Sequence, residues 1–235
     1  MCIRDRINGV YSAMALLDLD TAKAKKYTDT KSVKEESGYT SPFCYPLWPC
    51  DRVGEYILAK SAVAGAMIQY MASDNEDVPN QSPSNHLLGV GGQCLEDGTE
   101  VYLDQDQANT VNGYGVTTAI NQNGYRLWGN YTGAYPASSD AKDIWFAVRR
   151  MFSWQGNNFI QTYFDEVDDP MNNVLVQSVV DSENIRCSAY APKYWAGASI
   201  EYKSDDNPKT AILAGTMKFR QHIAPYTPAQ EIVDI

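Results

Sequence analysis

The chain changes its hydrophobic pattern near residue 115, and the part before that point mixes helical and extended signals. Val10, Met14 and Leu17 recur at helical spacing, which predicts a helix over residues 9–27. The polar stretch that follows, at residues 28–42, is typical of a loop.

Three further segments precede residue 115. Residues 42–50 contain three prolines, so we expect an extended segment at the edge of a core, outside any sheet. Residues 59–71 are apolar on nearly all sides, which predicts a helix buried within a layered α/β unit. A turn should then lead into a short strand at residues 86–90, followed by acidic loop residues and a second polar segment.

After residue 115 the pattern becomes more regular. Two β-prone runs flank Asn123 and Gly124, which both tolerate positive φ, so a β-hairpin is predicted. Apolar residues at helical spacing then predict one long amphipathic helix over residues 143–164.

Capping residues and the alternation of apolar and polar residues predict the remaining elements. Asp169 and Pro170 are expected to cap and begin a helix over residues 170–187. The last predicted elements are a strand at 198–202, a short helix at 207–215 and a strand at 217–223. The order β-β-α-α-β-α-β indicates an α+β domain with a small, mainly antiparallel sheet.

We therefore predict two regions of different fold class. Residues 1–114 are expected to form an α/β region, of which residues 1–39 are poorly assigned, and residues 115–235 an α+β domain. With 44% hydrophobic residues, the 235-residue chain can bury one large core or two modest ones.

The charge balance restricts the possible partners. The formal net charge is −10 and the pI is about 4.6, and residues 41–115 hold ten acidic but only two basic residues. Because nucleic-acid binding depends on clustered lysine and arginine, we expect no direct nucleic-acid partner. An acidic surface also repels anionic lipid, and the most apolar window, residues 57–72, is too short to cross a bilayer. We therefore expect no membrane insertion.

The cysteines suggest neither a metal site nor a disulfide framework. They are odd in number and lack CxxC spacing, and they lie at Cys2, Cys44, Cys50, Cys94 and Cys187. A reducing compartment fits this pattern best.

The chain offers little for catalysis. Its two histidines, His86 and His222, lie in a predicted turn and on the polar face of a predicted strand. Ser61 and Ser84 are not in a strand-to-helix elbow, so a Ser-His-Asp arrangement has little support. We predict no catalytic residues and no enzyme activity.

Cofactor and metal motifs are also weak. The glycine-rich residues 89–92 lack the lysine of a phosphate-binding loop. Asp104, Asp106 and Asn109 resemble calcium ligands, but the glycine and the closing glutamate of a calcium loop are missing, so an acidic surface is favoured. Acidic residues 165–169 are expected to mark a helix end followed by an N-cap. We predict no cofactor and no bound metal.

Aromatic residues make up 11% of the chain, and several fall in predicted loops. Tyrosine and tryptophan on loops are typical of protein interfaces, because they bury a large area while a polar tip stays satisfied. Ordinary core packing is the alternative for any one of them. The loop aromatics are Tyr45, Trp48, Tyr131, Tyr135 and Trp195.

A set of motifs over about residues 40–235 resembles the phage contractile tail sheath family. The motifs are "YPLWP", "SPSN", "GYRLWGNYT", "RRMF", "DEVDDPMN" and "PYTPAQEI", in this order. The resemblance implies a partial core with the layered α/β topology of subtilisin but without its active site, at residues 1–114. It implies a C-terminal α+β sheath domain at residues 115–235.

The resemblance also implies a function. Such subunits polymerise helically around a tail tube and contract, and the contraction drives the tube through the host envelope during genome ejection. The expected partners are further copies of the chain, the tail tube protein, and the baseplate and tail terminator proteins. The expected location is the virion tail, after assembly in the bacterial cytoplasm. Terminal arms that add strands to the sheet of the next subunit would join the copies.

Within this resemblance, two groups of residues stand out. The candidates for subunit or tube contacts are Arg126, Trp128, Thr132, Arg149 and Arg150. The candidates for structural positions are Pro83, Asn85, Gly124, Gly129, Pro170 and Pro228. For the stretch at 123–136, seating the hairpin on the following helix and a direct subunit contact are equally compatible with the pattern.

The ends of the chain depart from the family pattern. "MCIRDR" stands where a joining arm is expected, and "PAQEIVDI" stops where the family continues into an exchanged strand. Two other functions remain open: the sheath of a phage-derived secretion or bacteriocin device, and a divergent subtilisin-like hydrolase with His86 or His222 as its base.

Overall fold

The computed structural model describes residues 11–168, 170 and 172–230. Over these residues the chain forms two compact units. One extends to Ser153 and includes the described residues from Thr227 on, and the other runs from Trp154 to Tyr226. This division lies at a different place from residues 114/115, so the boundary between sheath domains that the motifs indicate remains a prediction.

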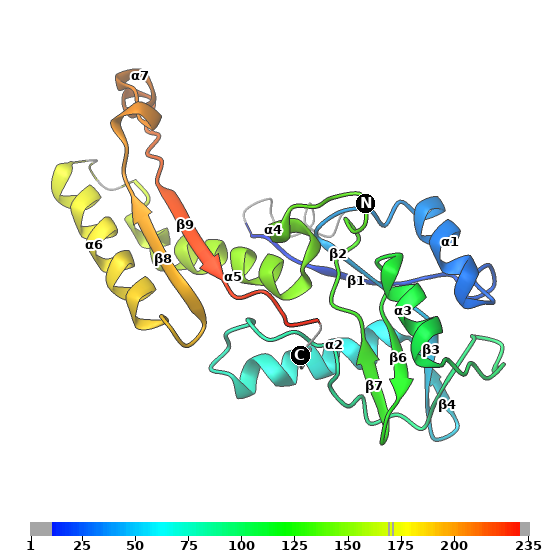
Figure 1. Ribbon diagram of the computed structural model, residues 1–235. Helices are drawn as coiled ribbons and strands as arrows, with labels where there is room; N and C mark the ends of the chain where they lie inside the picture. The colour runs from blue at the N-terminus through cyan, green and yellow to red at the C-terminus, as the bar shows by residue number, and fades with distance from the viewer. Residues whose placement is uncertain (1–10, 169, 171, 231–235) are drawn as a thin grey trace, which may run out of the picture. The chain divides into compact units, whose positions relative to one another are not determined.

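The first unit contains three small sheets and the helices around them (Figure 1). Its elements are β1 (Ala15–Asp18), α1 (Thr30–Glu36), β2 (Cys44–Leu47), β3 (Cys50–Val53), β4 (Tyr56–Leu58), α2 (Lys60–Asp74), β5 (Gly92–Cys94), α3 (Gln105–Gly113), β6 (Thr118–Asn121), β7 (Tyr125–Trp128), α4 (Ala141–Ile144) and the start of α5 (Phe146–Thr162). Strands β1 and β2 are parallel, β4-β3-β5 form an antiparallel sheet, and β6 and β7 pair as an antiparallel hairpin.

The helix predicted over residues 9–27 is wrong where the structure describes it. Ala15–Asp18 forms β1, with Ala15 opposite Cys44 and Asp18 opposite Leu47. Ala15 is buried, and the Leu16 side chain lies beside Gly65 of α2. Pairing with a distant strand thus outweighed the local helical spacing, and Val10 lies outside the described residues.

The proline-rich segment also differs from its prediction, because β2 is a fully buried strand that contains Pro46. On one side of β2 the neighbour is a single bridge residue, Thr117, whose N–H donates to the Pro46 carbonyl at 2.8 Å. Trp48 N donates in turn to Thr117 O at 2.9 Å. Thr117 forms only a single bridge on that side of β2, in place of an extended ladder of hydrogen bonds. The N–H that proline lacks is therefore not needed there.

Two stretches predicted as loops form helices. α1 lies within residues 28–42, and α3 lies within the polar segment before residue 115. Asp104 Oδ1 accepts the Gln107 N–H at 2.8 Å, and Gln107 Oε1 accepts the Asp104 N–H at 3.3 Å. This reciprocal capping box explains an acidic residue that resembled a calcium ligand.

Two more predictions need correction before residue 115. The strand expected at 86–90 is reduced to one isolated bridge between Leu87 and Arg126. The helix expected at 59–71 is present as α2, but it is buried along one face only. Tyr70 is 72% exposed, whereas the buried positions repeat every four residues, at Lys60, Ala64, Ile68 and Ala72.

The core that supports the hairpin joins four elements of the first unit. Helix α2 packs its buried face beside β2, β7 and the start of α5. The tyrosine and phenylalanine rings of this cluster stack, with centroids 4.0 Å apart. Its buried members are Tyr45, Leu47, Ala64, Ile68, Leu127 and Phe146.

The hairpin predicted around Asn123 and Gly124 is confirmed. Asn123 has a φ of 55° and Gly124 a φ of 104°, and β6 and β7 pair from Thr118–Trp128 inward. A Cβ atom on Gly124 would also lie 3.0 Å from Leu87 Cδ2. Both backbone conformation and space therefore favour glycine here.

Besides the short 3₁₀ helices Phe164–Glu166 and Ser204–Asp206, the second unit contains the rest of α5 and four further elements. They are α6 (Asn173–Ala189), β8 (Trp195–Glu201), α7 (Lys209–Leu213) and β9 (Arg220–Pro225). β8 and β9 lie side by side as an antiparallel pair (Figure 1). The predicted order β-β-α-α-β-α-β is found except that the first of its helices is divided into α4 and α5, and mixed helices with small antiparallel sheets are present. The strands form two separate pairs, β6-β7 and β8-β9, where a single sheet was expected.

Two helix boundaries differ from their predictions. Trp145 has extended backbone angles, which separate α4 from α5 within the single helix expected at 143–164. Helix α6 begins after Asn172, whose Oδ1 accepts the Leu175 N–H at 2.9 Å. Pro170 is therefore not a first-turn residue, and Asp169 lies outside the described residues.

Lys34 of α1 is a buried cation inside the first unit. Its Nζ donates to the carbonyls of Tyr114 at 2.8 Å and Tyr135 at 2.6 Å, and the residue is 3% exposed. A Cβ atom on Gly115 would lie 2.6 Å from this Nζ. Burial lowers the pKa of Lys34 from 10.5 to about 8.

This shift predicts a pH dependence of stability. Between about pH 8 and pH 10.5 the unfolded chain binds more protons at Lys34 than the folded chain. The free energy of unfolding should therefore rise with pH across this window, relative to a Lys34→Met variant, and the difference should be constant below pH 8. Urea unfolding of both proteins over this range measures it. A difference that falls with rising pH would contradict the assignment.

Candidate functional site

The exit of the hairpin is fixed by Gly129. Its φ is 147°, and a Cβ atom there would lie 2.5 Å from Thr117 Oγ1 and 2.9 Å from Thr117 Cα. Tyr45 Oη donates to the Gly129 carbonyl at 2.8 Å, and the Gly129 N–H donates to Ser84 Oγ at 3.1 Å. Only glycine fits this position, which attaches the hairpin to β2.

Arg126 and Trp128 hold neighbouring segments against the hairpin. Arg126 Nη1 donates to the Asn85 carbonyl at 2.8 Å, and Trp128 Nε1 donates to Asn109 Oδ1 of α3 at 2.8 Å. Asn85 has a φ of 66°, and Pro83 beside it is buried. The "SPSN" motif thus forms a rigid turn that packs on β7, as its residues suggested.

Thr132 also holds the exit of the hairpin in place. It is fully buried, its N–H donates to Ile144 O at 2.8 Å, and its hydroxyl donates to Asp143 O at 2.5 Å. These bonds attach the hairpin exit to α4. This geometry supports a structural role for Thr132, which holds the hairpin against the following helix. A role for Thr132 in a subunit contact remains a prediction.

The arginine pair at the start of α5 makes contacts inside the first unit. Arg149 Nη1 pairs with Asp143 Oδ1 at 3.0 Å, and its guanidinium lies 4.0 Å from the centre of the Phe43 ring. The Arg150 guanidinium lies 5.4 Å from the Phe146 ring, and burial lowers the pKa of Arg150 to about 10. Their proposed contact with another subunit or the tube is therefore not their only interaction.

A polar groove lies beside the hairpin exit, and sequence reasoning missed it. It has a volume of about 740 Å³ and is lined by Ser82, Ser84, Asn85, Gln105, Asn109, Asn112, Gly113, Trp128, Asn130, Tyr131, Tyr135, Pro228, Ala229 and Gln230. Among these lining residues the polar groups are amides, hydroxyls and an indole, without a carboxylate or an ammonium group.

The C-terminal segment docks in this groove through Gln230. The Gln230 amide donates to Asn130 Oδ1 at 3.0 Å and accepts from Tyr131 Oη at 2.8 Å. Asn130 is 6% exposed, and the Tyr131 ring stacks on Tyr135 with centroids 3.8 Å apart. Pro228 therefore belongs to a docked segment. A contact across 100 residues leaves no local sequence signal.

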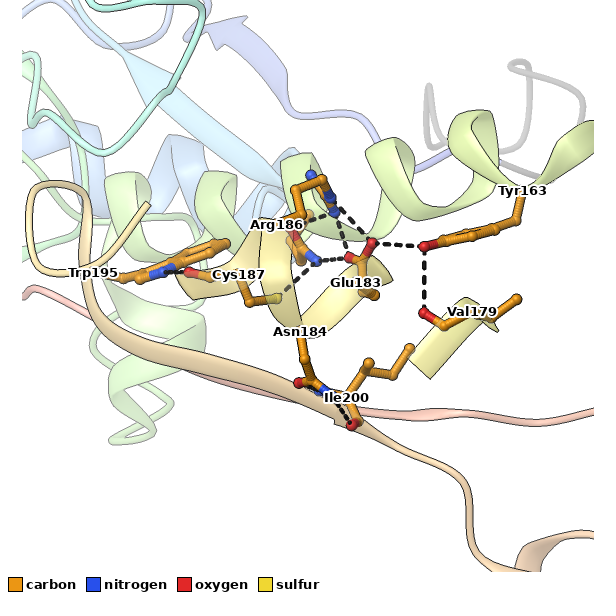
Figure 2. Close-up of polar contacts among 9 residues, drawn as sticks. Tyr163, Val179, Glu183, Asn184, Arg186, Cys187, Trp195 and Ile200 are labelled. Carbon is orange, nitrogen blue, oxygen red and sulfur yellow. Dashed lines mark hydrogen bonds and ion pairs between the residues drawn. The ribbon is translucent and has the colours of Figure 1, made fainter. Parts of the chain in front are cut away.

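The second unit is organised around the buried carboxylate of Glu183 on α6 (Figure 2). Arg186 binds it through Nε at 3.0 Å and Nη2 at 2.5 Å, and Gln155 Nε2 of α5 donates to it at 2.5 Å. Tyr163 Oη donates to the same carboxylate at 3.4 Å. Arg186 also donates to Gln155 Oε1 at 3.0 Å, so a closed network joins α5 to α6.

Helix α6 also holds strand β8 (Figure 2). The Asn184 amide donates to Ile200 O at 3.1 Å and accepts the Ile200 N–H at 3.0 Å, so one side chain substitutes for a neighbouring strand. Trp195 Nε1 donates to the Cys187 carbonyl at 3.0 Å. Together these bonds fix the β8-β9 pair on α6.

The two histidines have different surroundings. His222 Nε2 lies 2.9 Å from Glu201 Oε1 on an exposed part of β9, and burial lowers the pKa of His86 in the other unit. Within the part of the chain that the structure describes, no group of three His, Cys, Asp or Glu residues is placed to hold a metal. None of the helices there is long and apolar enough to span a membrane.

Comparison with known proteins identifies relatives among phage tail components. The chain is 28% identical over 180 residues to the major tail sheath protein of Serratia phage KSP20, covering 74% of this chain and 44% of that protein. It is 22% identical over 215 residues to the tail sheath protein of Escherichia phage P2, covering 86% and 52%. The chain thus spans about half the length of these curated relatives. No family model matches.

Solved structures show the same fold. The sheath complex of the PVC extracellular contractile injection system, in its contracted state, superposes with a TM-score of 0.78 at 17% identity, over 94% of this chain and 63% of that one. The contracted baseplate of the anti-feeding prophage gives 0.78 at 19% identity, over 99% and 67%. The resemblance to contractile tail sheath proteins is confirmed.

Proposed function

Since the chain resembles phage tail sheath proteins, we propose that it is part of a structural subunit of a contractile sheath. Copies polymerise helically around a tail tube, and contraction drives the tube through the host envelope. The two phage relatives named as tail sheath proteins carry this proposal. Proteins with this role are structural, so the subunit acts without catalysis. It assembles in the bacterial cytoplasm and functions in the virion tail.

The proposed subunit has two sheath domains. Residues 1–114 supply the end of a layered core with subtilisin-like topology, and residues 115–235 supply the C-terminal sheath domain. The described hairpin, long helix and β8-β9 pair support the assignment of the second of these domains. Tail tube, baseplate and tail terminator proteins are its further partners.

Assembly is proposed to use exposed strand edges. β9 alternates between exposed and half-buried residues along its length, so one of its faces is open. Among the described residues β9 pairs only with β8, so its other edge is open as well. An arm from a neighbouring copy that pairs there would extend the sheet by main-chain hydrogen bonds. Because such a contact is head-to-tail and does not close, it generates a helix of subunits.

Contraction then follows from a change of subunit packing. An extended lattice assembled in a metastable arrangement relaxes to a tighter one, and the difference in interface free energy moves the tube. The same reasoning applies to a phage-derived injection device, and the likeness to the PVC and anti-feeding prophage structures favours this second candidate. Capsid and terminase genes beside this one would indicate a virion.

The arginine at 149 allows a test of subunit contacts. Arg149→Glu breaks the internal pair with Asp143, whereas Arg149→Glu with Asp143→Lys restores the pair with reversed charges. Both side chains are partly exposed, so the swap also exchanges the positions of a positive and a negative charge at the surface. We expect the swapped variant to fold as the wild type but to form few sleeves, scored by negative-stain microscopy. Normal sleeves from it would limit Arg149 to an internal role.

A further inference from the structure

An apolar pocket in the second unit lies beside the Glu183 network, and Tyr163 belongs to both. Its volume is about 530 Å³, and it opens between α5, α6 and the segment that leads into β9. Its apolar lining is Phe159, Tyr163, Val167, Leu175, Val179, Met217 and Phe219. Glu166 and Asp168 also line it, and both residues are exposed, so the pocket has an apolar floor and an acidic rim.

The same unit exposes an apolar projection with a basic residue beside it. Leu213, at the end of α7, is 87% exposed, and Ile212 is 37% exposed. Lys209 is exposed and lies four residues before Leu213, so the two side chains share one side of the helix. The projection therefore presents an aliphatic side chain and a cation together.

We propose that the Leu213 projection of one copy inserts into the pocket of a second copy, with Lys209 against Glu166 and Asp168. The aliphatic Leu213 side chain matches the apolar floor of the pocket, and the Lys209 ammonium group matches its acidic rim. This inference rests on the proposed self-assembly and names one of its contacts. Projection and pocket are two different patches, so the contact is heterologous and repeats from copy to copy without closing.

Single-site variants of the gene product that contains this chain test the contact. Leu213→Asp should weaken self-association by about tenfold or more, because burial of one leucine is lost. Glu166→Lys with Asp168→Lys should weaken it as well, by opposing Lys209. Ile185→Asp is the matched control, since Ile185 is 73% exposed on α6 outside the pocket lining, and it should leave association unchanged. Sedimentation velocity measures all of them.

Mixing the variants separates this contact from a general loss of solubility or fold. The Leu213→Asp subunit keeps its pocket, and the Glu166→Lys/Asp168→Lys subunit keeps its projection. An equal mixture should associate more strongly than either variant alone, because each mixed pair regains one intact contact. Wild-type association of Leu213→Asp, or an equal loss in Ile185→Asp, would overturn the inference.

Three outcomes distinguish this inference from the proposed function. If the wild type forms sleeves and Leu213→Asp forms them equally well, the sheath role stands and the contact does not. If Leu213→Asp fails only when tube protein is present, the projection contacts the tube instead of a second copy. If the wild type forms no sleeves under any condition, the proposed function itself is wrong.

Discussion

Replacing Lys60 by methionine is expected to lower the free energy of unfolding of the first unit by about 3–5 kcal/mol, since one partner of a buried ion pair is removed. Lys60, at the start of α2, pairs with Asp51 of β3, and both side chains are fully buried. Burial raises the pKa of Asp51, and the Lys60 charge opposes that rise. Among the described residues, Asp51 Oδ2 has no hydrogen-bond partner, so the lysine supplies most of the compensation.

A double variant tests whether the charge causes this loss. Lys60→Met with Asp51→Leu leaves no buried charge and should recover most of the stability. Lys23→Met removes an exposed pair with Glu36 and should cost less than about 1 kcal/mol. Urea unfolding, combined with hydrogen exchange of α2 and β3, assigns the effect to this unit. Equal losses in the single and double variants would contradict the explanation.

Glu183→Leu should have the largest effect in the second unit, a loss of about 3 kcal/mol in the free energy of unfolding. The change leaves Gln155 and the Arg186 guanidinium without their shared acceptor (Figure 2). The Arg186 side chain is 23% exposed and can partly return to water, so the loss lies at the low end for a broken buried pair.

Two further variants make the test specific to the network. Glu183→Gln keeps the shape and one acceptor and should lose less than Glu183→Leu. Asp181→Ala removes an exposed hydrogen bond from Gln177 on the same helix, so it should change stability by less than about 0.5 kcal/mol. Urea unfolding, combined with hydrogen exchange of α6 and β8, reports on this unit. A loss for Asp181→Ala as large as that for Glu183→Leu would contradict the role of the network.

Elements with strong local signals could be predicted from the sequence. Asn123 and Gly124 require positive φ and so define the hairpin, and the apolar spacing that follows defines α5. In both cases the residues that determine the structure lie within a few positions of one another in the sequence. Most of the order of elements in the C-terminal part follows from such signals, whereas the break between α4 and α5 was not predicted.

Predictions failed where a distant partner decided the structure. Ala15–Asp18 becomes a strand because β2 pairs with it, and β2 accepts Pro46 because Thr117 forms only one bridge there. Helix α3 was missed for a local reason, because Asp104, interpreted as part of an acidic surface, forms a capping box with Gln107 three residues away. Propensity is a weak signal against such tertiary pairing.

The candidate site was predictable only in part. Gly129 and Asn85 were identified as structural positions, and their positive φ explains them. The groove that binds Gln230 was missed because its two sides are 100 residues apart. Arg149 and Arg150 stood out as surface cations, but the Phe43 and Phe146 rings beside them are set by the fold. Side-chain partners of this kind cannot be read from charge alone.

Electron microscopy of the gene product that contains this chain, expressed with and without its tube partner, tests the sheath role most directly. We expect tubular sleeves of helically arranged subunits, more numerous or more regular when the tube is present. A protein that stays monomeric at high concentration with tube present, and that turns over a peptide or ester substrate in a manner dependent on His86 or His222, would contradict that role.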